Sequence, residues 1–146
     1  MDRRLSYLVI AFAIVGLCIS GYSFAHHESF VSGAICSLNE TFNCDVVNRG
    51  PFSELFGVPV ALIGLVGYGF LVAAGVVCLK RPEDISARTF LMLAAMGGLG
   101  FSFYLTGLEA FVLKTWCLLC LTSQISILII FASSAYLRYS VRKRPV

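Results

Sequence analysis

The hydrophobic pattern of this chain is a succession of four long apolar runs separated by short polar segments. Residues 5–25, 55–79, 89–108 and 115–137 contain no Asp, Glu, Lys or Arg. Each run has about 20 residues or more, which is the length an α-helix needs to cross about 30 Å of hydrocarbon. Because a segment in lipid must satisfy its own backbone hydrogen bonds, each run predicts a transmembrane helix. The expected spans are residues 5–25, 58–79, 88–108 and 115–137.

Composition supports the same interpretation. Hydrophobic residues make up 58% of the 146 residues, charged residues make up 13%, and the mean hydropathy is +0.87. A soluble domain usually has about 25% charged residues. We therefore expect an all-α membrane protein, with residues 1–146 forming a single four-transmembrane-helix domain. The first run could instead be a signal peptide with a cleavage site at Ala25, but its apolar stretch exceeds the usual length of about 7–15 residues.

The distribution of basic residues predicts the orientation in the membrane. If the N-terminus is cytoplasmic and the helices alternate, nine basic residues lie on the cytoplasmic side and two, Arg49 and Lys114, lie on the other. The nine are Arg3, Arg4, Lys80, Arg81, Arg88, Arg138, Arg142, Lys143 and Arg144. This bias follows the positive-inside rule, so both termini are expected in the cytoplasm. The rule accounts for the basic residues, so we expect lipid but no nucleic acid as a partner.

The outer face then receives a long first loop, about residues 26–57. Within it, the segment 51–57 begins with Pro51 and ends with Gly57. Proline suits the first position of a helix and glycine suits its end, so we expect a short interfacial helix here. His26 and His27 open the loop and are expected to be solvated, with no assigned role.

Four of the six cysteines are predicted on the outer side, where disulfides persist. Cys36 and Cys44 lie in the loop, and Cys117 and Cys120 open the fourth run. Residues three apart on a helix share a face, so the last two thiols should point the same way. Free N–H groups at a helix N-terminus favour thiolate over thiol, and Lys114 adds a cation nearby. The two cysteines inside the spans, Cys18 and Cys78, are interpreted as small buried hydrophobic residues.

Two other interpretations of the four outer cysteines remain open. They could bind zinc, although the spacing of Cys36 and Cys44 is loose for a zinc site. Both pairs could also be inert structural disulfides. A disulfide inside one helical turn would be strained, however, and strained disulfides tend to be labile. We therefore expect redox chemistry and no metal.

Taken together, these motifs resemble the vitamin K epoxide reductase family, specifically its small bacterial-type members without a fused thioredoxin-like domain. The resemblance covers essentially the whole chain. Four features carry it: the loop pair Cys36 and Cys44, the Asp45-Val-Val-Asn that follows, the Leu55-Phe-Gly-Val-Pro59 segment, and Trp116-Cys-Leu-Leu-Cys120.

The resemblance implies a bundle around a quinone (ubiquinone, menaquinone or vitamin K type), with Cys117 and Cys120 as the active-site pair and Cys36 and Cys44 as the shuttle pair. Quinone contacts are expected from Gln124, one turn beyond Cys120, and from side chains near the interface. These are Ser53, Phe52, Phe56 and Trp116. Two positions depart from the pattern, because Gly50 stands where many relatives have a Ser or Thr and Gln124 stands where some have a Tyr.

The expected function is a membrane thiol–disulfide oxidoreductase that supports disulfide-bond formation. A separate thioredoxin-like protein on the periplasmic, extracytoplasmic or luminal side would reduce the loop pair, and electrons would pass through the CxxC pair to the quinone. One alternative is reduction of a vitamin K-type quinone epoxide. A second is a non-enzymatic four-span protein with structural disulfides.

Overall fold

The computed structural model describes residues 2–32 and 36–142. Its long helices are α1 (Asp2–His27), α3 (Val60–Lys80), α4 (Ile85–Leu108) and α5 (Leu118–Arg142), and the π-helical turn η2 (Glu109–Leu113) extends α4. The loop after α1 holds the short helix α2 (Cys44–Asn48) and the strands β1 (Glu54–Leu55) and β2 (Val58–Pro59). Within the described residues, four helices are long and apolar enough to cross a membrane, with η2 continuing the third. The predicted bundle is confirmed, and its helices extend a few residues beyond most of the predicted ends.

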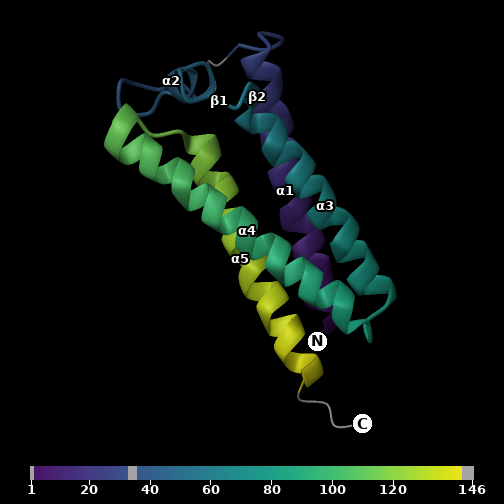
Figure 1. Cartoon of the computed structure of the whole chain (residues 1–146). Helices are drawn as coiled ribbons and strands as arrows, with labels where there is room; N and C mark the ends of the chain where they lie inside the picture. The colour runs from purple at the N-terminus through teal and green to yellow at the C-terminus, as the bar shows by residue number, and fades with distance from the viewer. Residues whose placement is uncertain (1, 33–35, 143–146) are drawn as a thin grey trace.

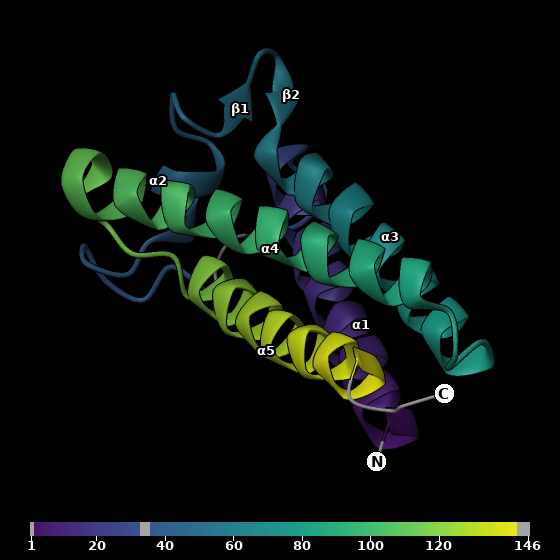
Figure 2. The same cartoon turned by 60° about the horizontal axis from the view of Figure 1, so that its bottom comes forward.

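The helices are arranged as two neighbouring pairs. Helix α1 packs along α3, α5 packs along α4, and α1 also packs along α5. The contact between α3 and α4 is smaller, so that side of the bundle is the most open. Figures 1 and 2 show both termini at one end, with α2 and the two strands at the other. The four long helices therefore run between the same two ends of the bundle, and the long loop lies at the end opposite the termini.

The core of the bundle depends on a close approach between α1 and α3. Its buried residues come from all four long helices and include Val9, Ala13 and Leu91. The ring of Tyr68 lies directly over Gly16, where a Cβ atom would overlap the ring. Glycine at this position therefore allows Tyr68 to reach inward across the bundle.

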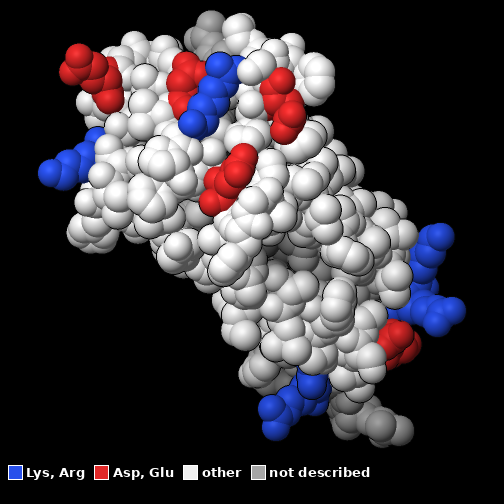
Figure 3. Space-filling view, turned by 45° about the horizontal axis from the view of Figure 1, so that its top comes forward, with Lys and Arg blue, Asp and Glu red and all other residues white. Residues whose placement is uncertain are grey.

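A buried arginine joins three helices at the end that carries the termini. Arg88 is 1% exposed, and its guanidinium donates to the carbonyl oxygen of Leu137 at 2.7 Å and to Asp2 Oδ2 at 3.4 Å. Arg88 was counted among the basic residues of the cytoplasmic side, and in the structure the carbonyl groups near the C-terminus of α5 stabilise its charge. Figure 3 shows charged residues towards the two ends of the visible face and an uncharged band between them. Lys143 and Arg144, counted for the orientation, lie outside the described residues.

The predicted interfacial helix at residues 51–57 is wrong. The amide of Ser53 donates to the Gly50 carbonyl at 3.0 Å, so Pro51 occupies the second position of a turn, where proline is also favoured. Strands β1 and β2 then pair antiparallel around Phe56 and Gly57, which both have positive φ angles (53° and 79°). Two central residues with positive φ fit a tight hairpin, so the proline and glycine mark turns. The short helix of the loop is α2 instead.

Candidate functional site

Backbone pairing brings the loop cysteines to the fourth transmembrane helix. The amide of Trp116 donates to the carbonyl of Thr41 at 2.8 Å, and the amide of Asn43 donates to the carbonyl of Trp116 at 3.2 Å. Asn43 also caps α2, because its side-chain oxygen accepts from the amides of Asp45 and Val46. These bonds place Cys44, the first residue of α2, beside Cys117.

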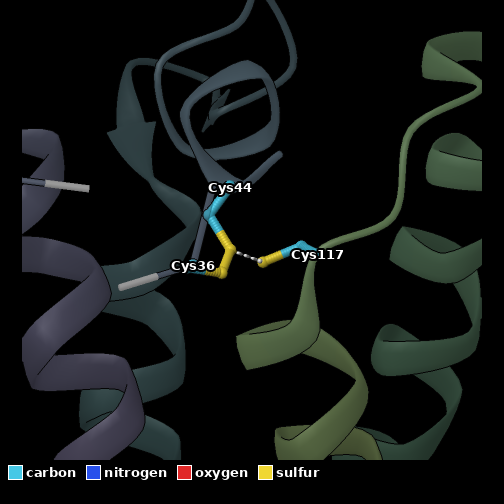
Figure 4. Close-up of side chains that lie close together, drawn as sticks. All are labelled: Cys36, Cys44 and Cys117. Carbon is cyan, nitrogen blue, oxygen red and sulfur yellow. Dashed lines mark hydrogen bonds between the residues drawn. A yellow bond between two sulfur atoms is a disulfide. The ribbon is translucent and has the colours of Figure 1, made fainter. Parts of the chain in front are cut away.

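Three sulfur atoms meet at this point, within 4.8 Å of one another (Figure 4). Cys36 and Cys44 form a disulfide, and Sγ of Cys44 lies 3.2 Å from Sγ of Cys117. All three residues are buried, with exposed fractions of 3%, 1% and 0%. The loop pair and the CxxC pair are therefore in contact across 73 residues of sequence.

The CxxC motif begins one residue before the helix, whereas both cysteines were predicted to lie in its first turn. Helix α5 begins at Leu118, so Cys117 precedes it and only Cys120 lies in its first turn. The amide of Cys120 donates to Sγ of Cys117 at 3.4 Å. The side chains of the two cysteines also form a hydrogen bond.

The pKa of Cys117 lies below the usual value of a thiol. The main cause is a hydrogen bond from the Cys120 side chain, and the backbone amides of Cys120 and Leu119 add to it. Burial and the charge of Glu109 oppose this lowering. The helix N-terminus thus acts as predicted, whereas Lys114 is exposed and is not among the causes. Cys117 is therefore the better nucleophile of the pair.

A carboxylate that was not singled out from the sequence completes the CxxC environment. Glu109 is 2% exposed, and its Oε2 accepts the backbone N–H of Cys117 at 3.0 Å. Its sequence signal was its position as the sole acidic residue between two apolar runs, eight residues before Cys117. Glu109 lies within the third candidate span, Ile85–Leu113, and ionisable residues within membrane spans are rare and often functional.

The two histidines at the end of α1 hold α2 in place and are not freely solvated. Nε2 of His26, which is 1% exposed, makes a close contact of 2.7 Å with Oδ1 of Asp45, although it is not a well-aligned hydrogen bond. The carbonyl of His26 accepts from the Arg49 guanidinium at 3.0 and 3.2 Å. Nδ1 of His27 lies 2.7 Å from the carbonyl oxygen of Asn48. Both ends of α2 are thereby tied to α1.

A cavity of about 680 Å³ opens beside the cysteines. Most of its wall is formed by apolar side chains and glycines of the four long helices, and Cys120 lies on that wall. Its size is in the range of sites that enclose a small organic molecule. Because α3 and α4 pack least closely, their facing residues line much of the cavity.

Few polar groups line this cavity. Nδ2 of Asn48 is buried and has no hydrogen-bond partner among the described residues. The hydroxyl of Tyr68 lies 2.8 Å from both the carbonyl and the hydroxyl oxygen of Ser123. A free amide donor and a phenol beside Cys120 suit a ligand with carbonyl groups on an apolar ring. Asn48 was part of a noted motif, but neither it nor Tyr68 was predicted as a contact.

The predicted quinone contacts are only partly near this space. Phe52 and Ser53 line a second, smaller cavity of about 40 Å³ next to the large one. Phe56 is 99% exposed at the hairpin tip, and Trp116 pairs through its backbone with the loop. Neither lines the large cavity or the small one. Gln124 is also absent from both walls, because its Oε1 accepts from Thr106 at 2.8 Å.

The two remaining cysteines lie away from the sulfur cluster. Cys78 is 1% exposed and belongs to the core, as predicted. Cys18 is exposed on α1, so the prediction that it is buried is wrong. Neither lines the large cavity or the small one.

Comparison with known proteins agrees with the geometry. The sequence model of the vitamin K epoxide reductase family matches residues 7–135. No curated protein sequence matches the chain. The matched region includes most of each apolar helix and both cysteine pairs.

Proposed function

Because the chain belongs to the vitamin K epoxide reductase family, whose members are membrane bundles that link thiol–disulfide chemistry to quinones, we propose that it oxidises a separate thioredoxin-like protein and passes the electrons to a quinone. In this proposal the protein supports disulfide-bond formation on the non-cytoplasmic side of the membrane. The observation that carries it is the 3.2 Å separation between Sγ of Cys44 and Sγ of Cys117, at a disulfide already formed by Cys44.

The loop pair receives the electrons first. A thiolate of the reduced partner attacks Cys36, the disulfide with Cys44 breaks, and Cys44 leaves as a thiolate. A second partner thiolate then releases Cys36 and closes the partner's own disulfide. Cys36 is the appropriate target because the freed sulfur, that of Cys44, is the one that lies beside Cys117. Two electrons have then moved to the loop pair.

The second exchange delivers these electrons to the CxxC pair. The thiolate of Cys44 attacks Cys117 in the Cys117–Cys120 disulfide, and Cys120 leaves. Cys36 then attacks Cys44, which restores the loop disulfide and leaves both CxxC residues reduced. The lowered pKa of Cys117 makes it a good leaving group in this step.

The large cavity fits a quinone ring. Asn48 would donate its unpaired amide hydrogen to one carbonyl, and Tyr68, with Ser123, would form the other polar contact. The apolar wall would hold the ring and exclude water. A bound quinone supplies the two-electron acceptor. Cys120, the only cysteine on that wall, is the donor thiolate, and Cys117 closes the disulfide behind it.

The test compares a protein reductant with a small one. A purified thioredoxin-like protein and dithiothreitol are each offered to the wild type, Cys36→Ala/Cys44→Ala, Cys117→Ala and Cys120→Ala, and quinol formation is recorded. The loop variant should lose activity with the protein but keep it with dithiothreitol, which can reach the CxxC pair directly. The other two variants should lose both activities. Cys18→Ala and Cys78→Ala serve as controls and should retain most activity.

Three outcomes would contradict the proposal. Equal loss with both reductants in the loop variant would mean that the loop pair shapes the quinone site and is not a shuttle. Turnover of a quinone epoxide with dithiothreitol, without oxidation of the thioredoxin-like protein, would favour the other activity. Normal activity of Cys120→Ala would remove Cys120 as the electron donor.

A further inference from the structure

Glu109 is a buried carboxyl group in direct contact with the CxxC pair. Its Oε2 accepts the N–H of Cys117, and its Oε1 has no hydrogen-bond partner among the described residues. The carboxyl also interacts with the Cys120 side chain. It lies in η2, a π-helical turn, and such turns often occur at functional sites. Burial of an ionisable group is costly unless all its polar atoms are paired, and one oxygen of Glu109 is not.

A small cavity borders Glu109 and extends to Phe52, which is 42% exposed. The cavity has a volume of about 40 Å³, enough for water, and Glu109, Cys120 and His27 all border it. The His27 side chain is 15% exposed, and its Nε2 lies 3.5 Å from Glu54, which is 51% exposed. The small and large cavities share Asn48 and Cys120 among their lining residues. Cys120 therefore stands between the large cavity and the space that reaches Glu109.

The proposed reaction has to move protons as well as electrons. Oxidation of two thiols to a disulfide releases two electrons and two protons, and reduction of a quinone to a quinol takes up two of each. The apolar wall of the large cavity offers few groups that could carry a proton. A titratable group at the CxxC pair is therefore needed.

We propose that Glu109 carries the proton of the Cys120 thiol to the quinone. The carboxylate accepts this proton, so that Cys120 becomes the thiolate that gives up electrons as the Cys117–Cys120 disulfide forms. The protonated carboxyl then delivers the proton to the reduced acceptor. The proton of Cys117 is released to solvent. The quinone takes up its second proton from solvent, through the small cavity past His27. This inference rests on the proposed function, and it adds Glu109 as a catalytic residue.

The competing explanation is that Glu109 only holds the backbone of Cys117. Glu109→Gln separates the two roles, because the amide oxygen still accepts the N–H of Cys117 but the side chain no longer titrates. The titratable side chains near Glu109 are those of Cys117 and Cys120 and, across the small cavity, His27 on α1. Asp45, on the α2 helix that packs against η2, contacts His26. Glu40→Gln, at an exposed acidic position in the loop, is the matched control.

The first measurement needs no quinone. Reduced-minus-oxidised infrared difference spectra of the purified protein, poised with dithiothreitol and its oxidised form, report changes in carboxyl protonation when the CxxC disulfide forms. A carboxyl signal should occur in the wild type and in Glu40→Gln and be absent in Glu109→Gln. A wild-type spectrum without a carboxyl signal, or one that persists in Glu109→Gln, would overturn the proposal.

The second measurement is the rate of quinol formation with dithiothreitol. Loss of a proton-transfer group typically costs about 10²–10⁴-fold, so Glu109→Gln should be slowed by roughly 100-fold or more. Trapping of the Cys44–Cys117 mixed disulfide in a Cys120→Ala background should be unchanged. Loss of trapping together with activity would assign Glu109 a structural role. A wild type that reduces no quinone would end the proposed function, and the infrared spectra would still decide whether Glu109 exchanges a proton with the thiols.

Discussion

Nε2 of His26 lies 2.7 Å from Oδ1 of Asp45, which links the last turn of α1 to the residue that follows Cys44. The histidine is buried, whereas the Asp45 side chain is 46% exposed. The position of Cys44 therefore depends on a contact with a transmembrane helix as well as on the backbone pairing with Trp116. The Cys36–Cys44 disulfide is held against the CxxC pair from two sides.

Replacement of His26 should loosen this arrangement. His26→Ala removes the contact with Asp45, and because Asp45 is half exposed we expect a cost of about 1 kcal/mol. In a Cys120→Ala background, the fraction of protein trapped as the Cys44–Cys117 mixed disulfide should fall by roughly fivefold, as measured on non-reducing gels. Glu28→Ala is the control, because Glu28 is an exposed residue two positions after His26. Equal trapping in both variants would show that the backbone pairing alone positions Cys44.

The titration of Cys117 should depend on Cys120. The pKa of Cys117 is lowered chiefly by the Cys120 hydrogen bond, so its thiolate forms at a lower pH than that of an ordinary cysteine, about 8.5. In Cys120→Ala this support is lost, so the titration should move to higher pH. The pKa is measured from the thiolate absorbance of the reduced protein at a series of pH values, after subtraction of the absorbance of the Cys117→Ala protein. Cys120→Ser, which keeps a hydroxyl donor, should lie between the two, and an unchanged midpoint in Cys120→Ala would contradict the assignment.

Orientation remains a prediction from the charges and can be tested at the hairpin. Cys36 and Cys44 are poor reporters because they are buried, and a tag at Val146 would lie outside the described residues. Phe56→Cys, at a side chain 99% exposed, should react with an impermeant maleimide from the non-cytoplasmic side. Arg81→Cys, exposed at the other end of α3, should react only after the membrane is permeabilised. The reverse labelling pattern would invert the topology and remove the proposed partner.

Packing of Tyr68 should be sensitive to a single added methyl group. In Gly16→Ala the new Cβ would overlap the Tyr68 ring, and such overpacking typically costs about 1–3 kcal/mol. A lower thermal midpoint and weaker quinone binding should follow, because Tyr68 lines the large cavity. Gly100→Ala, where a Cβ meets nothing within 4 Å, should leave both unchanged. A Gly16→Ala protein as stable as the wild type would mean that α1 and α3 can separate without cost.

The sequence by itself determined the helices and the thiol chemistry. Residues 5–25 and the other apolar runs have no alternative to helix in lipid, because their backbone groups must pair within the segment. Cys117 and Cys120 are three residues apart at the start of α5, so their contact is local in the chain. These features depend on neighbours in the chain, so the pattern of residues was sufficient to predict them.

Only the tertiary structure decided which residues surround the sulfur atoms. Glu109 and Asn48 become neighbours of Cys120 through the packing of η2 and α2, and no local pattern indicates that contact. Phe56 illustrates the converse. Pro51 and Gly57 suit the two ends of a helix, but they also suit two turns. In the hairpin that forms, the side chain of Phe56 is exposed. Cys44 and Cys117 meet across 73 residues because backbone hydrogen bonds join two distant segments, which is a property of the folded chain alone.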